Sequence, residues 1–223
     1  MIVAIDGPAG SGKSTVAKRV AEKLGFHYLD TGAMYRAVAF RALASGVLPS
    51  DEAKVAAIAV NDEVSFGHEP GEALASRVFI GGDDVTKAIR LPRVDDAVSA
   101  VARLSRVREA MLEQQRRLAS ADNVVIEGRD IGTVVFPEAE VKIFLTATPE
   151  ERARRRAAQH AAGGLLVDPA GVRESIHRRD EADSTRAVAP LVPADDALIV
   201  DTTGMTLAQV IDRVVALVSG ARA

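Results

Sequence analysis

Short apolar runs alternate along the chain with longer segments in which apolar residues recur at helical spacing. The first run is Ile2-Val3-Ala4-Ile5, and a helical pattern follows from about Ser14 to Leu24. Further strand-like runs lie at Phe26–Leu29, Val124–Ile126, Val141–Leu145 and Leu198–Val200. Uninterrupted apolar strands separated by helices are typical of parallel sheets covered on both faces. The pattern therefore predicts an α/β fold with a five-stranded parallel sheet flanked by helices.

Two segments depart from this pattern. Residues 64–66 and 77–80 have the alternation of hairpin strands and lie close to a Gly-rich turn at 81–84, which predicts a small inserted antiparallel subdomain. Residues 150–186 contain two helical segments dense in arginine around Gly163-Gly164. Because 223 residues are too few for two ordinary domains with linkers, we expect one globular unit that carries insertions.

Composition narrows the class of protein. Apolar residues make up 48% of the chain and charged residues 26%, the balance of a soluble globular protein. The lack of cysteine excludes disulfides and thiolate chemistry, and the net charge of −3 argues against bulk nucleic-acid binding. No basic leader precedes Ile2, and no apolar run reaches the roughly 18 residues of a membrane span. We expect a cytoplasmic enzyme, a monomer, with neither a membrane nor a nucleic-acid polymer as its partner.

The most specific motif is a phosphate-binding loop (P-loop). Gly7-Pro8-Ala9-Gly10-Ser11-Gly12-Lys13-Ser14-Thr15 matches G-x-x-x-x-G-K-[ST] and lies between a predicted strand and a predicted helix. Glycines let backbone N–H groups converge on phosphate oxygens, and the ammonium of Lys13 adds positive charge. The motif predicts that residues 7–15 bind the phosphates of a nucleotide, that Lys13 stabilises their charge and takes part in catalysis, and that Ser14 coordinates Mg²⁺.

Nucleotide binding alone does not define the reaction, so arginines outside the loop become informative. A GTP-dependent switch would be expected to carry an Asn-Lys-x-Asp element, and the sequence has none. Arg152, Arg155 and Arg156 stand at helical spacings of three and four and can share one helix face. They are either a solvated face paired with Glu150 and Glu151, or cations for the moving phosphoryl group. The P-loop favours the second interpretation and hence a phosphotransferase.

A second set of polar residues has helical spacing further along the chain. Arg179, Asp183 and Arg186 fall at i, i+4 and i+7, which predicts one shared face of a helix that ends before Pro190. A local salt bridge between Arg179 and Asp183 is the structural alternative to a binding role, and it would contribute only about 0.3–0.5 kcal/mol.

Polar residues also follow one of the predicted strands directly. Glu127-Gly128-Arg129-Asp130 comes immediately after the apolar run at 124–126. Its side chains are therefore expected at the carboxyl edge of the sheet, where doubly wound proteins bind ligands. Glu127 is a candidate to orient magnesium-bound water, and capping of the loop is the equally weighted alternative.

Together these motifs resemble the bacterial cytidylate kinases, relatives of the adenylate kinases and other nucleoside monophosphate kinases. The resemblance covers nearly the whole chain and rests on residues 5–8, 29–36, 82–86, 127–133 and 186–191. Many enzymes share the P-loop, whereas the second, fourth and fifth stretches together are specific to this family. The resemblance implies phosphoryl transfer from MgATP to CMP or dCMP by a single domain over residues 1–223. It also implies an acceptor-binding insert at about 36–95 and a lid at about 151–168.

The resemblance implies roles for individual residues as well. The acceptor phosphate would contact Arg36 and Arg129, the cytosine would contact Ser99, Arg108 and Asp130, and the ribose hydroxyls would contact Arg179 and Asp183. Thr31 would join the acceptor site, and the transferring phosphates would face Arg152, Arg156 and Arg186. Ser105 stands where proline is common in the family, and we expect it to cap the helix that carries Arg108. The loop Thr202-Thr203-Gly204 is a candidate adenine contact.

Two other activities remain compatible with the residues. The first is a kinase for another small acceptor, such as UMP, dTMP or a non-nucleotide alcohol. The second is an ATP-dependent binding or regulatory module, which would not consume ATP faster when a monophosphate is added. In a monophosphate kinase no covalent intermediate is required, because a phosphate oxygen of the acceptor is itself the nucleophile.

Overall fold

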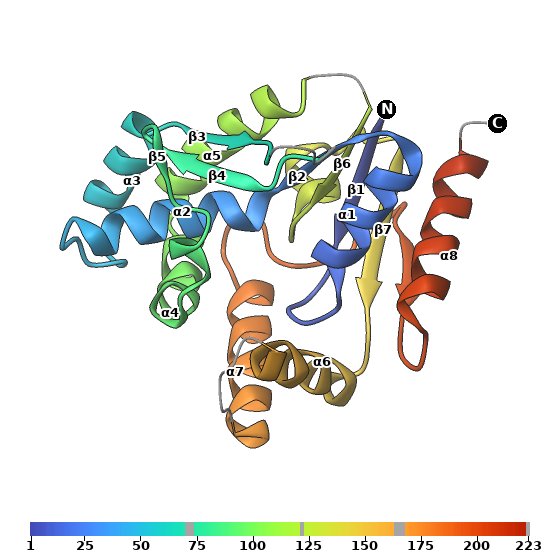
Figure 1. Cartoon of the computed structure of the whole chain (residues 1–223). Coiled ribbons are helices and arrows are strands. Elements are labelled where there is room, and N and C mark those ends of the chain that lie inside the picture. The colour runs from blue at the N-terminus through green and yellow to red at the C-terminus, as the bar shows by residue number, and fades with distance from the viewer. Residues whose placement is uncertain (70–73, 121–122, 163–167, 222–223) are drawn as a thin grey trace. The chain divides into compact units, whose positions relative to one another are not determined.

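The computed structural model describes residues 1–69, 74–120, 123–162 and 168–221. The chain divides into two compact units, of which the first comprises Met1–Phe26 and Asn123–Ala223 and the second comprises His27–Asp122. Figure 1 shows the helices and strands of both units in chain order. The first unit contains the P-loop and the arginine-rich helices, and the second contains the hairpin strands expected from the sequence.

A five-stranded parallel sheet has the strand order β2-β6-β1-β7-β8. Its strands are β1 (Ile2–Asp6), β2 (His27–Asp30), β6 (Val124–Glu127), β7 (Val141–Thr146) and β8 (Leu198–Asp201). The central strand is β1, in which Val3 is in register with Val125 of β6 and Val141 of β7. Val3 is fully buried, as expected for an apolar strand covered on both faces. The predicted strands are confirmed to within one residue at each end.

The described part of the first unit contains four α-helices besides the short turn η2 (Ile131–Val135). They are α1 (Lys13–Leu24), α6 (Pro149–Ala162), α7 (Pro169–Ser184) and α8 (Leu207–Gly220). Helix α8 buries one apolar stripe and begins with a capping box, in which Thr206 accepts from the backbone N–H of Gln209 while the Gln209 side chain bonds back. It packs beside α1, and α6 packs on α7 (Figure 1). The predicted Gly163-Gly164 turn between α6 and α7 lies outside the described residues.

Helix α7 ends earlier than the sequence suggested. Its last residue is Ser184, with Thr185 at the C-cap, so the prediction that Arg186 shares a helix face with Asp183 is wrong. The Thr185 hydroxyl donates to the carbonyl of Glu181 at 2.6 Å, a local bond of the kind that competes with helix continuation. The chain then turns back, and the N–H of Leu191 donates to the carbonyl of Asp183 at 2.9 Å.

The second unit combines a small sheet with helices. The sheet is antiparallel, with the order β3 (Val64–Gly67), β4 (Arg77–Ile80) and β5 (Asp83–Asp84). Its helices are α2 (Thr31–Ala44), α3 (Glu52–Asn61), η1 (Ala88–Arg90), α4 (Pro92–Val101) and α5 (Ser105–Leu118). The predicted hairpin is confirmed, but Asp83 and Asp84 are not only a turn, because they pair with Ile80 and Phe79 as a third strand.

Ser105 does not have the capping role that the sequence suggested. Leu104 occupies the N-cap position of α5, no side chain caps it there, and Ser105 is already the first helical residue. A carboxylate from another helix supplies an acceptor instead, since Glu52 accepts from the N–H of Arg106 at 3.1 Å. The position of Arg108 therefore depends on α3 packing against α5 rather than on a local cap.

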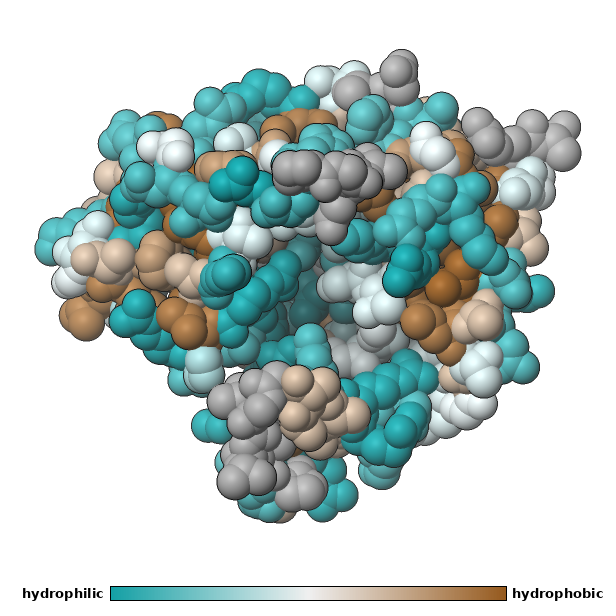
Figure 2. All heavy atoms as spheres, in the orientation of Figure 1, coloured by the Kyte–Doolittle hydropathy of each residue, from teal (hydrophilic) through white to brown (hydrophobic). Residues whose placement is uncertain are grey.

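Hydrophilic residues cover most of the face shown in Figure 2. The exposed large apolar side chains include Leu48, Val60 and Ile199, with exposed fractions of 70%, 68% and 66%. Single exposed apolar residues of this kind are ordinary on globular proteins. Within the described parts of the chain, no helix is both long enough and apolar enough to cross a membrane.

Candidate active site

The P-loop follows β1 and turns directly into α1, and its backbone requires glycine. Gly7 has φ +148°, and a Cβ there would lie 2.1 Å from the carbonyl oxygen of Leu145 on β7. At Gly10, with φ +75°, a Cβ would lie 2.9 Å from the carbonyl oxygen of Arg152. Both positions allow the loop to lie directly against β7 and α6, which only a residue without a side chain permits.

Lys13 places a buried ammonium group inside the loop. Its side chain is 5% exposed, and Nζ donates to the carbonyl of Pro8 at 2.7 Å and to Ser11 Oγ at 3.3 Å. Burial lowers the pKa of Lys13 well below its usual range, and the nearby guanidinium groups of Arg129 and Arg179 lower it further. A dehydrated cation beside two others favours an anionic ligand, as a polyphosphate would be.

Ser14, within the P-loop, and Glu127 bring two side-chain oxygen groups together. Ser14 Oγ donates to Glu127 Oε2 at 2.8 Å, and Glu127 is buried at the end of β6. Hard oxygen donors of this kind suit Mg²⁺, which is usually held by one or two protein groups together with phosphate oxygens. The described residues contain no cluster of three or more carboxylate, imidazole or thiol groups that could hold a metal alone. The pair therefore fits a metal that arrives with a nucleotide.

Arg152 connects α6 to the backbone of the P-loop. Its NH1 donates to the carbonyl of Ala9 at 3.1 Å, and its Nε donates to the carbonyl of Ala147 at 3.1 Å. Arg152 also pairs with Asp180 of α7, whose other oxygen accepts from the N–H of Ala9 at 3.1 Å. Arg152 and Asp180 thus hold both sides of one loop residue. Local sequence patterns did not point to Asp180, because its partners are distant in the chain.

The other two arginines predicted to face the phosphates have different surroundings. Arg156 is partly exposed on α6, and its NH1 donates to Gln159 of the same helix at 2.9 Å. Arg186 is 8% exposed, and its Nε donates to the carbonyl of Asp183 at 3.1 Å. Of the predicted trio, the structure brings Arg152 into contact with the loop.

Asp183 is a carboxylate surrounded by positively charged side chains in the first unit. Its Oδ2 accepts from Arg129 Nε at 3.0 Å. Burial raises its pKa, but the charges of Arg129, Arg186 and Arg179 outweigh this effect and hold the pKa of Asp183 below its usual value. The carboxylate therefore stays ionised at neutral pH and gathers around it Arg129, Arg179 and Arg186, three residues that the sequence proposed for substrate contacts.

Asp6 is a functional candidate that the sequence reasoning missed. It ends β1, and its two carboxylate oxygens accept from the N–H groups of Ile131 at 2.9 Å and Gly132 at 2.8 Å. These residues open the short π-helical turn η2 (Ile131–Val135), which follows Asp130 directly. Asp6 therefore fixes the segment that carries Arg129 and Asp130. The available signal was a charged residue at the end of an apolar strand.

The buried position of Asp6 predicts an unusual pH dependence of stability. Burial raises its pKa from 3.8 to about 6, more than the two backbone hydrogen bonds lower it. The folded state thus binds more protons than the unfolded state between these values, so this group lowers the free energy of unfolding as pH rises from about 4 to 6. We expect the stability of Asp6→Asn relative to wild type to improve over that range by on the order of 3 kcal/mol.

Urea unfolding of both proteins at pH 4 to 8 measures this difference. Above pH 7 the two stability curves should run parallel, because Asp6 is then ionised in both states. A difference that stays constant from pH 4 to 7 would contradict the assignment.

The second unit carries the remaining candidates. Thr31 begins α2 and is buried, Ser99 lies partly exposed on α4, and Arg108 is buried on α5. The guanidinium carbon of Arg108 lies 5.6 Å from the centre of the Tyr35 ring, within cation–π range. Arg108 also donates to the carbonyl of Ala102 at 3.2 Å. These two contacts hold the Arg108 side chain in place and fix the direction of its N–H groups.

Arg36 is held by a carboxylate that the sequence did not single out. It is 8% exposed on α2, its NH1 donates to the carbonyl of Ile89 at 3.2 Å, and its NH2 pairs with Asp95 of α4. Asp30, which caps α2, similarly pairs with Arg90 at 3.3 Å. The second unit therefore presents arginines in fixed orientations, which is the form of group that recognises phosphate.

Comparisons with known proteins agree with this arrangement. Residues 3–220 match the family model described as cytidylate kinase. A cytidylate kinase of Pelotomaculum thermopropionicum is 52% identical over 220 residues, covering 99% of this chain and 96% of that protein. One of Desulfitobacterium hafniense is 48% identical over 215 residues, covering 96% of this chain and 91% of that protein. A solved structure of an uncharacterized protein from Eubacterium ventriosum has a TM-score of 0.52 at 11% identity, covers 98% of both chains, and supports the fold alone.

Proposed function

Because the chain belongs to the cytidylate kinase family, we propose that it transfers the γ-phosphoryl group of MgATP to CMP or dCMP, giving ADP and CDP or dCDP. The observation that carries the proposal is the buried ammonium of Lys13 in the P-loop with Arg129 and Arg179 near it. Charge spreads over the oxygens of a phosphoryl group during transfer, so cations fixed in a dry site stabilise the transition state.

Several residues of the first unit would serve the phosphate donor. The P-loop N–H groups would bind the phosphates of ATP, and Lys13 with Arg152, Arg156 and Arg186 would neutralise their charge. Ser14 and Glu127 would hold Mg²⁺, which when bound neutralises phosphate charge. No side chain needs to form a covalent bond, because the acceptor phosphate is the nucleophile. Catalysis would rest on positioning and electrostatics.

For the first unit, we propose that Arg129, Asp130, Arg179 and Asp183 contact the acceptor. For the second unit, taken by itself, we propose acceptor contacts by Thr31, Arg36, Ser99 and Arg108. Residues 36–95 would form the acceptor-binding insert and residues 151–168 the lid, of which 163–167 lie outside the described residues. We further propose that the protein acts as a cytoplasmic monomer.

A coupled assay of ADP release tests the proposal. MgATP is supplied with CMP, dCMP, UMP, AMP, GMP, dTMP or shikimate in turn, and without any acceptor as the control. We expect rapid ADP release with CMP and dCMP and a low background without acceptor, since closure of the site excludes water. A faster rate with another acceptor would assign a different kinase. ATP binding with no acceptor-dependent turnover would indicate a regulatory module.

Asp183 should distinguish the two sugars of the acceptor. A carboxylate that accepts hydrogen bonds from ribose hydroxyls loses one of them when the 2′-OH is absent. Asp183→Ala should therefore lower the affinity for CMP more than the affinity for dCMP. Because Asp183 also holds Arg129, both substrates should lose affinity, and the ribose contact is read from the ratio of the two KM changes. Asp183→Asn retains an acceptor and serves as the matched control. Equal losses for CMP and dCMP would remove the 2′-OH contact from the assignment.

A further inference from the structure

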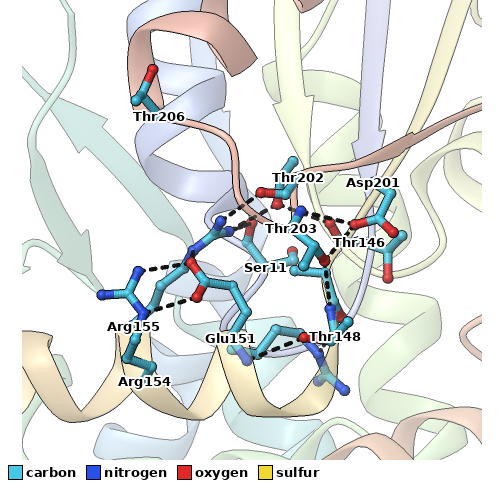
Figure 3. A network of polar contacts seen from close by, with 12 residues as sticks. Ser11, Thr146, Thr148, Glu151, Arg154, Arg155, Asp201, Thr202, Thr203 and Thr206 are labelled. Atoms are coloured by element: carbon cyan, nitrogen blue, oxygen red, sulfur yellow. Dashed lines mark hydrogen bonds and ion pairs between the residues drawn. The ribbon is translucent and has the colours of Figure 1, made fainter.

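Arg155 joins three segments of the first unit with one guanidinium group (Figure 3). Its Nε donates to Glu151 of its own helix at 2.8 Å, and its NH1 donates to the carbonyl of Ser11 in the P-loop at 3.2 Å. It also reaches Thr202, which follows β8, through NH1 to Oγ1 at 2.8 Å and NH2 to the carbonyl at 2.9 Å. We refer to Glu151, Arg155, Ser11 and Thr202 as the Arg155 clamp.

The contact with Ser11 has a direct consequence for the phosphate-binding groups. In a trans peptide the C=O and the following N–H point in opposite directions, and the described chain contains no cis peptide bond. A Ser11 carbonyl held toward Arg155 therefore turns the N–H of Gly12 away from α6. Arg152, one turn earlier on α6, holds the carbonyl of Ala9 in the same manner. Two arginines of α6 thus orient two alternate peptide groups of the P-loop by binding their carbonyl oxygens.

The contact with Thr202 is equally well defined. Thr202 is 1% exposed, and its hydroxyl donates to the carbonyl of Thr146 at 2.9 Å while accepting from Arg155. The next residue, Thr203, accepts from the N–H of Thr148 at 3.0 Å and donates to Asp201 at 2.6 Å. Figure 3 shows these bonds as one connected network. The loop after β8 is therefore tied to β7 on one side and to the P-loop through Arg155 on the other.

The ion pair within the clamp does not depend on pH under assay conditions. Bonds from Arg154, and then from Arg155, lower the pKa of Glu151 to about 2. Glu151 therefore stays ionised and holds the Arg155 side chain toward Ser11 and Thr202. Arg154 shares the same carboxylate but projects outward, with a side chain that is 70% exposed. The two arginines differ in what they contact beyond Glu151.

We propose that Arg155 is a positioning residue for the phosphate donor: it fixes the orientation of the Gly12 N–H relative to the loop at Thr202 and so sets the affinity for ATP. This inference rests on the proposed function for its choice of ligand. Arg155 acts through the P-loop backbone. Its loss should therefore lower the affinity for ATP and leave the affinity for the acceptor unchanged. Direct electrostatic contact with phosphate is not required of it.

Equilibrium binding of ATP without an acceptor tests the inference independently of turnover. We expect Arg155→Ala to raise the Kd for MgATP about tenfold or more, since several charge-assisted hydrogen bonds are lost together. Arg154→Ala removes a cation from the same helix and the same carboxylate, and its Kd should stay within about twofold of wild type. In steady state, Arg155→Ala should raise the KM for ATP while the KM for CMP changes less than about twofold.

Two more measurements separate positioning from general structural support. Arg155→Lys can donate to Ser11 or Thr202 but lacks the planar fork, and it should restore part of the ATP affinity. Hydrogen exchange without nucleotide should become faster in peptides spanning 8–16 and 201–206 in Arg155→Ala, and not in Arg154→Ala. The inference is overturned if both alanine variants bind ATP equally, or if Arg155→Ala raises the KM for ATP and CMP by the same factor. Failure of wild type to phosphorylate CMP would instead reject the proposed function, and the ATP-binding comparison would still decide the role of Arg155.

Discussion

We expect Lys13→Ala to lower kcat by at least about a hundredfold while the protein remains folded. The ammonium is buried within the loop, and catalysis by a site of this type is mostly electrostatic, so removing one cation removes stabilisation that only the transition state fully uses. We do not expect a comparably large decrease in the free energy of unfolding. Burial and the charges of Arg129 and Arg179 already disfavour the protonated lysine. The rate comes from the coupled ADP assay and the folded state from thermal unfolding.

Lys23→Ala is the matched control for this change. Lys23 lies on the same helix, where it is exposed and pairs with Asp212 at 2.7 Å. An exposed ion pair contributes little, so turnover should stay within about twofold of wild type. Near-normal turnover in a folded Lys13→Ala protein would remove the P-loop lysine from the mechanism.

We expect Asp130→Ala to abolish most of the preference for CMP over UMP, which for wild type should be at least roughly a hundredfold in kcat/KM. Cytosine presents a 4-amino donor where uracil presents an acceptor oxygen, and a carboxylate can only accept. Asp130 is 5% exposed, so a mismatch there would leave a desolvated charge without a hydrogen-bond partner on the base. The variant should lose CMP activity and leave the slow UMP reaction nearly unchanged.

Asp130→Asn sharpens the test because its amide offers a donor as well as an acceptor at nearly the same volume. The kcat/KM for UMP should then rise relative to that for CMP, because the amide NH₂ can donate a hydrogen bond to the uracil O4. Parallel kcat/KM measurements on both substrates decide the matter. Equal losses of CMP and UMP in Asp130→Ala, or a wild-type enzyme that uses both equally, would show that this residue does not read the base.

The sequence predicted the parallel sheet and the P-loop because both have local signals. Uninterrupted apolar runs such as Val124–Ile126 mark strands covered on both faces, and β6 was confirmed with Glu127 as its only addition. The glycines of the P-loop have a fixed spacing, and the positive φ angles at Gly7, Gly10 and Gly12 explain why that spacing is needed. The hairpin of β3 and β4 was likewise predicted from its alternation, whereas β5 was expected to be part of a turn.

The hydrogen-bond partners of the buried charged residues could not be predicted from the sequence. Asp180 bonds Arg152 and the P-loop, and Thr202 bonds Arg155, yet each partner lies far along the chain. Such pairs are decided by how helices and strands pack, which periodicity does not report. The end of α7 was misjudged for a related reason, because the Thr185 side chain takes the Glu181 carbonyl locally. Helical spacing extended the pattern to Arg186 without detecting that bond.

The central place of β1 in the sheet governs when this protein becomes able to fold. Ile2 pairs with Val124 and Val3 with Val141, so β1 must wait for partner strands that follow the whole of the 27–122 unit. Contacts between such distant segments close long loops and form slowly, whereas the second unit is continuous and can form from contacts within itself. We expect the second unit to fold first during synthesis on the ribosome. The P-loop at the end of β1, which Arg155 connects to Thr202, then takes shape only after the chain has emerged beyond Thr202.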